Sequence, residues 1–423
     1  MSVIKIDLSK KLGKMKPMHG GGQPPLLGHE TTHFHYMTEA GIPYSRLHDV
    51  GGPYGGGRYV DIPNLFRDFD ADENDPASYD FTFTDLLMKA LVEAKVEPYF
   101  RLGITIENAW DIKTYRTDPP KDYAKWARIC EHVIMHYTEG WADGFHYHIK
   151  YWEFWNEPEG EMMWKGSYED FYRLYDVLAK HLKPRFPNIA IGAYGSWGFR
   201  AIVPDKDKPS TAFEYRVVEF FEGFFKYIKE HNTPIDFFSW HSYLSTKRTV
   251  YQDEWLHKKL TEFGYGDLET HINEWNTNHY EFGHASQSAA CTATMIAMQN
   301  GHPAVMCIYD MRTNTAPYCP LFDIRTHKPI HTYYALVAFN ALYKLGTQVE
   351  TVCDTEDLYV LAASDGKKNA LLISNQTGEA KPLQIEGVDL TDARFYVLDE
   401  ERLLSWAPNA NMLQHNEVVL IEW

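Results

Sequence analysis

The sequence predicts an α/β fold, a closed (β/α)8 TIM barrel followed by a small accessory antiparallel β-sandwich domain. Three observations support this prediction. Short apolar strands alternate with amphipathic helices along most of the chain, as in parallel sheets. Polar and acidic side chains follow the ends of several strands, where barrel enzymes collect their chemistry. After about Gly346 the pattern changes to short alternating strands without helices between them.

Apolar segments that end at a glycine or a polar pair predict the strands of the barrel. An eighth strand near Met15–Gly20, before the turn Gly20-Gly21-Gly22, is expected to close the barrel and has the weakest pattern. The other seven are Tyr44–His48, Pro98–Gly103, Tyr151–Asn156, Ile189–Tyr194, Asp236–Tyr243, Glu269–Trp275 and Ala304–Asp310.

Helices are predicted between these strands because their apolar side chains recur with a period of about 3.6 residues. Each such helix can lay one apolar stripe on the outer face of the barrel. The predicted helices are Asp85–Ala94, Asp122–Tyr137, Tyr168–Lys183, Ser288–Asn300 and Tyr333–Leu345.

The last part of the chain predicts a separate β-domain. Its short alternating segments are divided by turn signals such as Ser364-Asp365-Gly366. Val3–Leu8 alternates in the same way and is expected to join this domain. We therefore predict a catalytic barrel over residues 12–346 and an accessory β-sandwich over 347–423, joined by an N-terminal strand within 1–11. The predicted strands of this domain are Val349–Thr351, Leu358–Ser364, Ala370–Asn375, Lys381–Glu386, Ala393–Leu398 and Glu417–Trp423.

Composition excludes several classes of protein. The 423 residues carry a formal net charge of −17, which disfavours a nucleic-acid partner. The five cysteines are scattered without a Cys-x-x-Cys pair, which is typical of free thiols rather than disulfides or a zinc site. No stretch approaches the roughly 20 apolar residues of a membrane span, and the N-terminus lacks the apolar segment of a signal peptide. We expect a cytoplasmic protein with no membrane partner, and a homo-oligomer stays open.

Two glutamates each follow an aromatic-rich strand, in Trp155-Asn156-Glu157-Pro158 and Asn273-Glu274-Trp275-Asn276. Their separation is about that of three βα units, so a barrel would bring both to one mouth. A carboxylic acid and a carboxylate facing one sugar are the minimum equipment for glycoside hydrolysis. The alternative is an ordinary strand-to-loop corner with a solvated carboxylate. The residues alone support the pair but do not decide which glutamate is the acid and which the nucleophile.

Further polar side chains share strand faces near this pair. Arg46 could hold Glu274 ionised through a charge-assisted hydrogen bond, or form a structural ion pair inside the barrel. Tyr243 could donate to the nucleophile, and His241 could contact a sugar hydroxyl, although a core histidine is the rival reading. His48 lies on the same face as Arg46.

Aromatic residues at strand ends are candidate sugar platforms, with core packing as the default for each. These residues are Trp110, Trp164, Trp275 and Tyr309. The closest histidine pairs, His33/His35 and His146/His148, lack helical i, i+4 spacing with a third ligand, so we expect no metal. Hydrolysis by two carboxyl groups also needs no organic cofactor.

Several motifs together resemble glycoside hydrolase family 39 of clan A, which holds β-xylosidases and α-L-iduronidases. The resemblance implies a (β/α)8 barrel with a β-sandwich and retaining hydrolysis, with Glu157 as acid/base and Glu274 as nucleophile. It also implies that Asn156 binds the sugar 2-hydroxyl and that His48, His241 and Tyr243 line the sugar subsite. The motifs are Tyr44-Ser45-Arg46-Leu47-His48, Pro119-Pro120-Lys121-Asp122-Tyr123-Ala124-Lys125-Trp126, Trp152-Glu153-Phe154-Trp155-Asn156-Glu157-Pro158, His241-Ser242-Tyr243 and Asn273-Glu274-Trp275-Asn276-Thr277.

Two positions depart from the family's xylosidases. Those enzymes tend to carry Glu before Leu-Gly on the third strand, where this chain has Arg101, and Trp on the last strand, where it has Tyr309-Asp310. Arg101 is expected either to meet an acidic sugar or to pair with Glu153, which lies deeper in the barrel than Glu157 and is expected to be structural. The roles of Arg101 and Asp310 stay open.

The function expected from the sequence is an exo-acting, retaining β-xylosidase-type hydrolase whose partner is an oligosaccharide or glycoside. A uronidase or arabinosidase on the same scaffold is the nearest alternative. A catalytically silent carbohydrate-binding barrel is the alternative from another class, and the presence of both glutamates argues against it.

Overall fold

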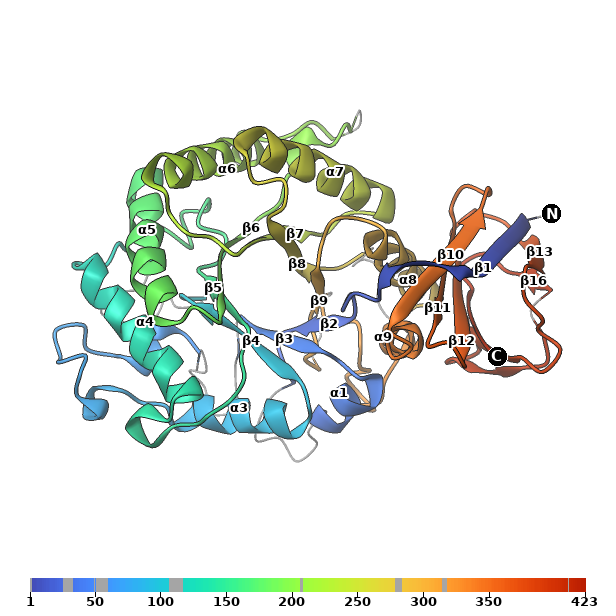
Figure 1. The fold of residues 1–423 in the computed structure, drawn as a ribbon, viewed down its shortest axis with the longest axis horizontal. Coiled ribbons are helices and arrows are strands. Elements are labelled where there is room, and N and C mark those ends of the chain that lie inside the picture. Colours follow the sequence, from blue (N-terminus) through green and yellow to red (C-terminus); the bar gives the residue numbers. More distant parts are fainter. Residues whose placement is uncertain are drawn as a thin grey trace.

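The fold is a closed barrel of eight parallel strands, ringed by helices, with a mostly antiparallel sheet at its side (Figure 1). The computed structural model describes residues 2–25, 33–48, 50, 60–105, 117–205, 208–277, 284–313, 318–409 and 411–423. The strands of the barrel follow one another in chain order, β2-β3-β4-β5-β6-β7-β8-β9. The predicted TIM barrel with an accessory β-domain is confirmed.

The barrel strands match the seven stronger predictions to within a few residues. The first strand differs, because the Gly20-Gly21-Gly22 segment itself forms β2. A Cβ on Gly20 would lie 2.5 Å from the Met306 carbonyl oxygen, so only glycine lets this strand approach its neighbour. The strands are β2 (Gly20–Gly22), β3 (Tyr44–Leu47), β4 (Glu97–Leu102), β5 (Tyr151–Phe154), β6 (Ala190–Ser196), β7 (Phe237–Ser242), β8 (Glu269–Trp275) and β9 (Val305–Tyr309).

Helices cover the outside of the barrel and bury one apolar face each. In α6, a capping box of Thr211 and Glu214 starts the helix, and Phe221, Phe224 and Phe225 are among its fully buried side chains. The helices are α1 (Phe34–Ala40), α2 (Ile62–Leu65), α3 (Thr82–Glu93), α4 (Tyr123–Thr138), α5 (Tyr168–Arg185), α6 (Ala212–His231), α7 (Thr246–Phe263), α8 (Ala285–Gln299) and α9 (His331–Tyr343), with short 3-10 turns at Pro76–Ser78, Trp141–Asp143 and Arg200–Ile202.

The accessory sheet has the strand order β15-β14-β17-β12-β11-β10-β1-β13-β16. Its N-terminal strand β1 pairs antiparallel with β10 and parallel with β13, and it runs past the predicted residues 1–11. The strands are β1 (Ser2–Lys14), β10 (Thr347–Cys353), β11 (Leu358–Ser364), β12 (Asn369–Asn375), β13 (Lys381–Glu386), β14 (Arg394–Leu398), β15 (Ser405–Ala407), β16 (Met412–Leu413) and β17 (Val418–Glu422).

The accessory sheet shares one core with the barrel and encloses a second core of its own. On β12, Leu372 belongs to the barrel-side core, whereas Leu371 and Ile373 belong to the other, as the two-residue period of a strand requires. The Ser374 hydroxyl donates to the Ala289 carbonyl of α8 at 2.7 Å, which ties the sheet to the barrel (Figure 1). Within the described ranges, no helix combines the length and apolarity needed to cross a bilayer.

Candidate active site

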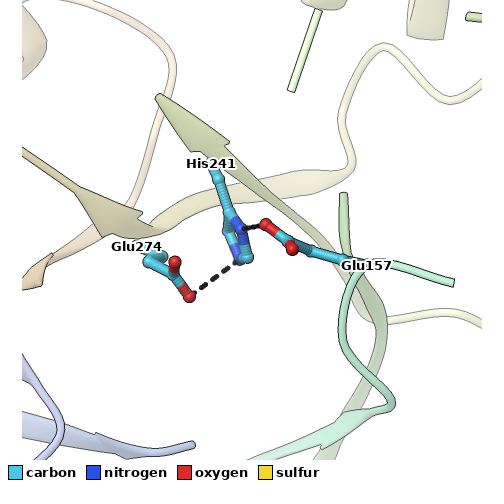
Figure 2. A group of neighbouring side chains, drawn as sticks. All are labelled: Glu157, His241 and Glu274. Atoms are coloured by element: carbon cyan, nitrogen blue, oxygen red, sulfur yellow. Dashed lines mark hydrogen bonds and ion pairs between the residues drawn. The ribbon is translucent and has the colours of Figure 1, made fainter. Parts of the chain in front are cut away.

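Glu157 and Glu274 meet at the mouth of the barrel formed by the carboxyl ends of the strands. Glu157 lies just after β5, Glu274 lies on β8, and the His241 ring of β7 stands between them (Figure 2). One oxygen of each carboxylate and one nitrogen of His241 lie within 4.8 Å of one another. The side chains expected from the sequence to work together therefore share one space. Their spacing would also admit a metal ion, which makes metal dependence a question for experiment.

An irregular turn after β5 aims Glu157 into the mouth. Trp155 and Glu157 both have positive φ, 68° and 44°, a left-handed conformation that is uncommon for residues with a side chain. The turn is held by the backbone of Glu157, which donates to the Gly195 carbonyl at 2.9 Å, and by the Trp155 indole, which donates to the Met163 carbonyl at 2.8 Å. Strained backbone of this kind clusters at functional sites.

Glu274 is buried and receives two strong donors. Arg46 donates through Nη1 to Oε2 at 3.0 Å, and the Tyr243 hydroxyl donates to Oε1 at 2.6 Å. The residue is 7% exposed. Hydrogen bonds to an ionised carboxylate stabilise its charged form, so this environment suits a carboxylate that must be negative to act as a nucleophile.

The Arg46 guanidinium, buried inside the barrel, holds the side chains of Glu274 and Asn156 in place. Its Nε donates to Glu153 at 2.7 Å and its Nη2 donates to the Asn156 side-chain oxygen at 2.6 Å, in addition to the bond to Glu274. Glu153 is fully buried and also accepts from the Ser239 hydroxyl and the Asn273 amide, as its expected structural role requires. Arg46 is 1% exposed and acts on a substrate through Glu274 and Asn156 rather than by touching it.

The two carboxyl groups differ in their environments and in their proton affinity. Burial raises the pKa of Glu157 to about 7, and the charge of Arg46 only partly opposes this. Burial also raises the pKa of Glu274 above its ordinary value, with the negative charge of Glu157 adding to the effect and His241, Arg46 and Tyr243 opposing it. A neighbouring pair of this kind retains one proton near neutral pH.

The His241 ring is neutral and links the two acids. Burial lowers its pKa to about 4, so the ring carries one proton at neutral pH. Nδ1 lies 2.7 Å from Glu157 Oε1, and Nε2 lies 3.6 Å from Glu274 Oε2. With the ring proton on Nε2, Nδ1 accepts from a protonated Glu157 while the N–H faces an ionised Glu274. This tautomer agrees with the raised pKa of Glu157.

A cavity of about 540 Å³ contains both carboxylates. Most of the side chains predicted for substrate binding line it, as do several that were not predicted. The predicted lining residues are His48, Asn156, His241, Tyr243 and Tyr309. Tyr309 accepts a hydrogen bond from the Gln23 amide at 2.7 Å. This volume is within the range of about 300–1,000 Å³ that is typical of small-molecule binding sites.

Two of the predicted aromatic platforms lie elsewhere. Trp275 is 1% exposed and sits in the hydrophobic core, because it follows Glu274 directly and adjacent strand residues point to opposite faces. Trp164 is 2% exposed and packs edge-on against Trp155, with ring centroids 5.3 Å apart. Both are core residues, which corrects the prediction of a sugar contact for Trp275. Trp110 lies outside the described residues.

Of the positions that depart from the family's xylosidases, Arg101 and Asp310 lie away from the described cavity lining, and Tyr309 lines it. Arg101 is fully buried and forms an ion pair with Asp61 rather than with Glu153. Asp310 is buried and pairs with Arg312 at 2.9 Å. Arg101 therefore does not pair with Glu153 and does not line the described cavity. Of Tyr309 and Asp310, only Tyr309 lines that cavity.

Sequence reasoning missed a wall of the cavity that follows β6. Trp197, Arg200 and Lys208 line the space next to the glutamates. The available signal was the tryptophan in Gly195-Ser196-Trp197-Gly198, directly after a predicted strand. Behind this wall, the Ser196 hydroxyl donates to buried Glu159 at 2.6 Å, and burial raises the pKa of Glu159 to about 8.

Comparisons with known proteins agree with this fold. The chain is 26% identical over 224 residues to a β-xylosidase of Geobacillus stearothermophilus, covering 51% of this chain and 39% of that protein. The chain thus spans well under two thirds of that relative's length. Among solved structures, a glucosidase from Croceicoccus marinus superposes with a TM-score of 0.79 at 19% identity, covering 100% of this chain and 98% of the other. A monomeric β-xylosidase from Caulobacter crescentus superposes with a TM-score of 0.68 at 16% identity, covering 100% and 99%.

The structural likenesses establish the fold, and the family assignment rests on the sequence. The family described as "Glycosyl hydrolases family 39" matches residues 4–280, which is more than half of the chain and includes both glutamates. The chain therefore belongs to glycosyl hydrolases family 39.

Proposed function

We propose that this hydrolase is a retaining, exo-acting β-xylosidase-type enzyme. The observation that carries the retaining mechanism is the approach of Glu157 and Glu274, whose nearest described oxygens lie within 4.8 Å. Retaining glycosidases hold their two carboxyl groups about 5–5.5 Å apart, whereas inverting enzymes need about 6.5–9.5 Å to fit a water. The spacing leaves room for direct attack on a sugar but not for an intervening water.

In the first step, Glu274 attacks the anomeric carbon while Glu157 donates its proton to the glycosidic oxygen. The bond to the leaving group breaks and an ester forms between the sugar and Glu274. The surroundings of each side chain support these roles. Arg46 and Tyr243 donate to Glu274 and favour its ionised form, whereas burial keeps a proton on Glu157 near neutral pH.

In the second step, Glu157 is ionised and removes a proton from water, which attacks the same carbon. The ester breaks, Glu274 leaves as a carboxylate, and the sugar is released with its original configuration. Asn156 supports both steps, since its side-chain oxygen accepts from Arg46 and leaves the amide N–H groups to meet a sugar hydroxyl.

A neutral pentose is favoured by the lining near Glu274 and by the similar β-xylosidase. His48, Tyr243 and Tyr309 line this side and offer hydroxyl and imidazole groups. Arg101, the residue that a uronic acid would have needed, is paired with Asp61 and does not line the cavity. The β-configuration and the exo mode come from the similarity to β-xylosidases.

A panel of nitrophenyl glycosides tests the substrate, and proton NMR of the first product tests the stereochemistry. We expect the β-xyloside to be the best substrate and β-xylose to form before it mutarotates. Turnover of a uronide or an arabinoside with no turnover of the xyloside would replace the proposed specificity. The appearance of α-xylose first would exclude retention, and binding without turnover of any glycoside would indicate a silent barrel.

A further inference from the structure

The wall after β6 borders the place where a leaving group must sit. Strand β6 lies next to β5, and the backbone of Glu157 donates to Gly195 of β6. Under the proposed function, Glu157 delivers its proton to the leaving group, so the leaving group lies on the Glu157 side of the cavity. Trp197 and Lys208 line the same cavity and come from the segment that follows β6.

Trp197 presents an aromatic surface in this wall. The residue is 36% exposed, whereas other tryptophans of the barrel, such as Trp152 and Trp240, are fully buried. The ring is fixed from behind by Phe213, at a centroid distance of 5.1 Å and an interplanar angle of 81°. A fixed, half-open indole suits stacking against the apolar face of a sugar ring.

The charges around Trp197 leave a positive surplus. Arg200 pairs with Glu214 at 2.8 Å, and Arg248 pairs with Asp205 at 2.9 Å. Lys208 also lines the cavity and has no acidic partner within the described part of the chain. An ammonium beside the cavity with no acidic partner among the described residues is uncommon in a protein whose net charge is −17.

Glu157 lines the same cavity as Lys208, but it does not cancel the positive charge of Lys208 while the leaving group is bound. The acid step requires Glu157 to be protonated, and burial raises its pKa so that the proton stays near neutral pH. An anionic leaving group would therefore meet the Lys208 ammonium and a neutral Glu157. Glu157 ionises when it gives up its proton, and the leaving group then departs.

We propose that this wall is a leaving-group subsite for an acidic sugar, an inference that rests on the proposed function. Trp197 would stack on the sugar ring, and Lys208 would pair with the carboxylate of the sugar. The substrate class is a neutral pentose linked to a uronic acid. Glu274 and its surroundings select the neutral sugar, and the wall after β6 selects the acidic one. The wall thus distinguishes acidic oligosaccharides from neutral ones.

A pair of disaccharides that differ only in charge tests the subsite. The first is xylose linked to glucuronic acid, and the second is xylose linked to the primary amide of that acid. We expect the wild-type enzyme at low salt to favour the acid by about 3- to 10-fold in kcat/KM, the size of one partly exposed ion pair. The preference should shrink at about 0.5 M salt, because screening weakens exposed pairs.

Lys208→Gln should bring the acid-to-amide ratio of kcat/KM close to one, mainly by raising KM for the acid. Trp197→Ala should lower kcat/KM for both disaccharides and keep the ratio. Lys226→Gln is the matched control, because Lys226 is exposed and does not line the cavity. It lies on α6, about 20 Å along the helix from its first residue. It removes the same charge without touching the cavity and should change neither the ratio nor the rate.

A wild-type ratio near one, or a ratio that Lys208→Gln leaves unchanged, would overturn the subsite. The proposed function fails in a different way, through the absence of turnover of nitrophenyl β-xyloside. In that case the acid and amide pair is built on whichever glycone the enzyme hydrolyses, and the ratio decides the subsite as before.

Discussion

Glu157 and Glu274 are the same kind of residue in contrasting surroundings. Glu274 lies on β8, at a shift in its pairing with β7. Its side chain is 9% exposed and accepts hydrogen bonds from Arg46 and Tyr243. Glu157 lies on a left-handed turn, and its side chain is 24% exposed and has the neutral His241 ring at hydrogen-bond distance. Under the proposed function, the donors around each glutamate, rather than residue type, assign one carboxyl group to attack and the other to proton transfer.

Removing each carboxyl group in turn should separate the two roles most strongly. Glu274→Ala should lower kcat by about 10⁴-fold or more on every substrate, because no nucleophile remains. Glu157→Ala should lower kcat/KM by about 10²–10⁴-fold for unactivated leaving groups but much less for nitrophenyl xyloside, which departs without a proton. Azide should rescue Glu157→Ala and yield xylosyl azide of retained configuration. Equal losses on all substrates in both variants would erase the distinction.

Arg46 anchors the Glu274 side, and its loss should destabilise the fold. Arg46→Met leaves fully buried Glu153 without a cation, which costs about 3–5 kcal/mol of unfolding free energy. Arg67→Met is the control, because the Arg67–Asp80 pair is exposed and should contribute about 1 kcal/mol or less. Urea denaturation followed by circular dichroism measures both. Similar losses in the two variants would show that Arg46 carries no special weight.

Tyr243 distinguishes the two glutamates through a single hydroxyl. Tyr243→Phe removes the donor to Glu274 Oε1 and keeps the ring. A hydrogen bond to a charged group contributes about 1.5–3 kcal/mol, so kcat/KM should fall by about 10- to 100-fold. The loss should be similar for activated and unactivated leaving groups, since it acts on the nucleophile. A loss confined to unactivated leaving groups would instead connect Tyr243 with proton transfer.

The pH dependence of kcat/KM should report the protonation of Glu157. Because Glu157 acts as an acid and burial raises its pKa to about 7, its active protonated form is lost as the pH rises. The kcat/KM for an unactivated xyloside should therefore fall above about pH 7. In the wild type, this limb should be much weaker in the kcat/KM profile of nitrophenyl xyloside, whose leaving group needs no proton. A limb that survives at the same pH would belong to another group.

Metal removal should have the smallest effect. Glu157, His241 and Glu274 are close enough to bind an ion, yet the two-carboxylate mechanism uses each of them without one. Dialysis against EDTA should change the rate of nitrophenyl xyloside hydrolysis by less than about 2-fold. Added zinc should inhibit if it changes the rate at all, because it would occupy both carboxylates. A loss on dialysis that zinc or manganese restores would assign these residues to a metal centre.

Most of the fold could be predicted from the sequence because the periodicity of each strand and helix is local. The exceptions include the helices α1, α6 and α7, for which no prediction was made. Strand β2 is a further exception, since three glycines carry no hydrophobic pattern and serve the close approach to Met306. The extent of β1 was also underestimated, because Leu8–Lys14 is exposed or half-buried and polar, and its pairing with β10 is set by tertiary structure.

The candidate site was predictable where strand parity governs it. Arg46 and Tyr243 reach Glu274 as their strand positions indicated. The same parity excludes Trp275, which neighbours Glu274 and must face the opposite side. Trp197 and Lys208 could not be found in this way, because they lie in a segment without regular periodicity whose course depends on packing against α6.

Trapping the glycosyl-enzyme tests the central claim most directly. A 2-deoxy-2-fluoro-β-xyloside with a good leaving group should inactivate the protein, since fluorine slows both the formation and the hydrolysis of the ester, and the good leaving group speeds only its formation. Peptide mass spectrometry should then find one fluoroxylosyl group on Glu274 and none on Glu157. A label on Glu157, or hydrolysis of xylosides without any covalent intermediate, would contradict the assignment of the two carboxyl groups.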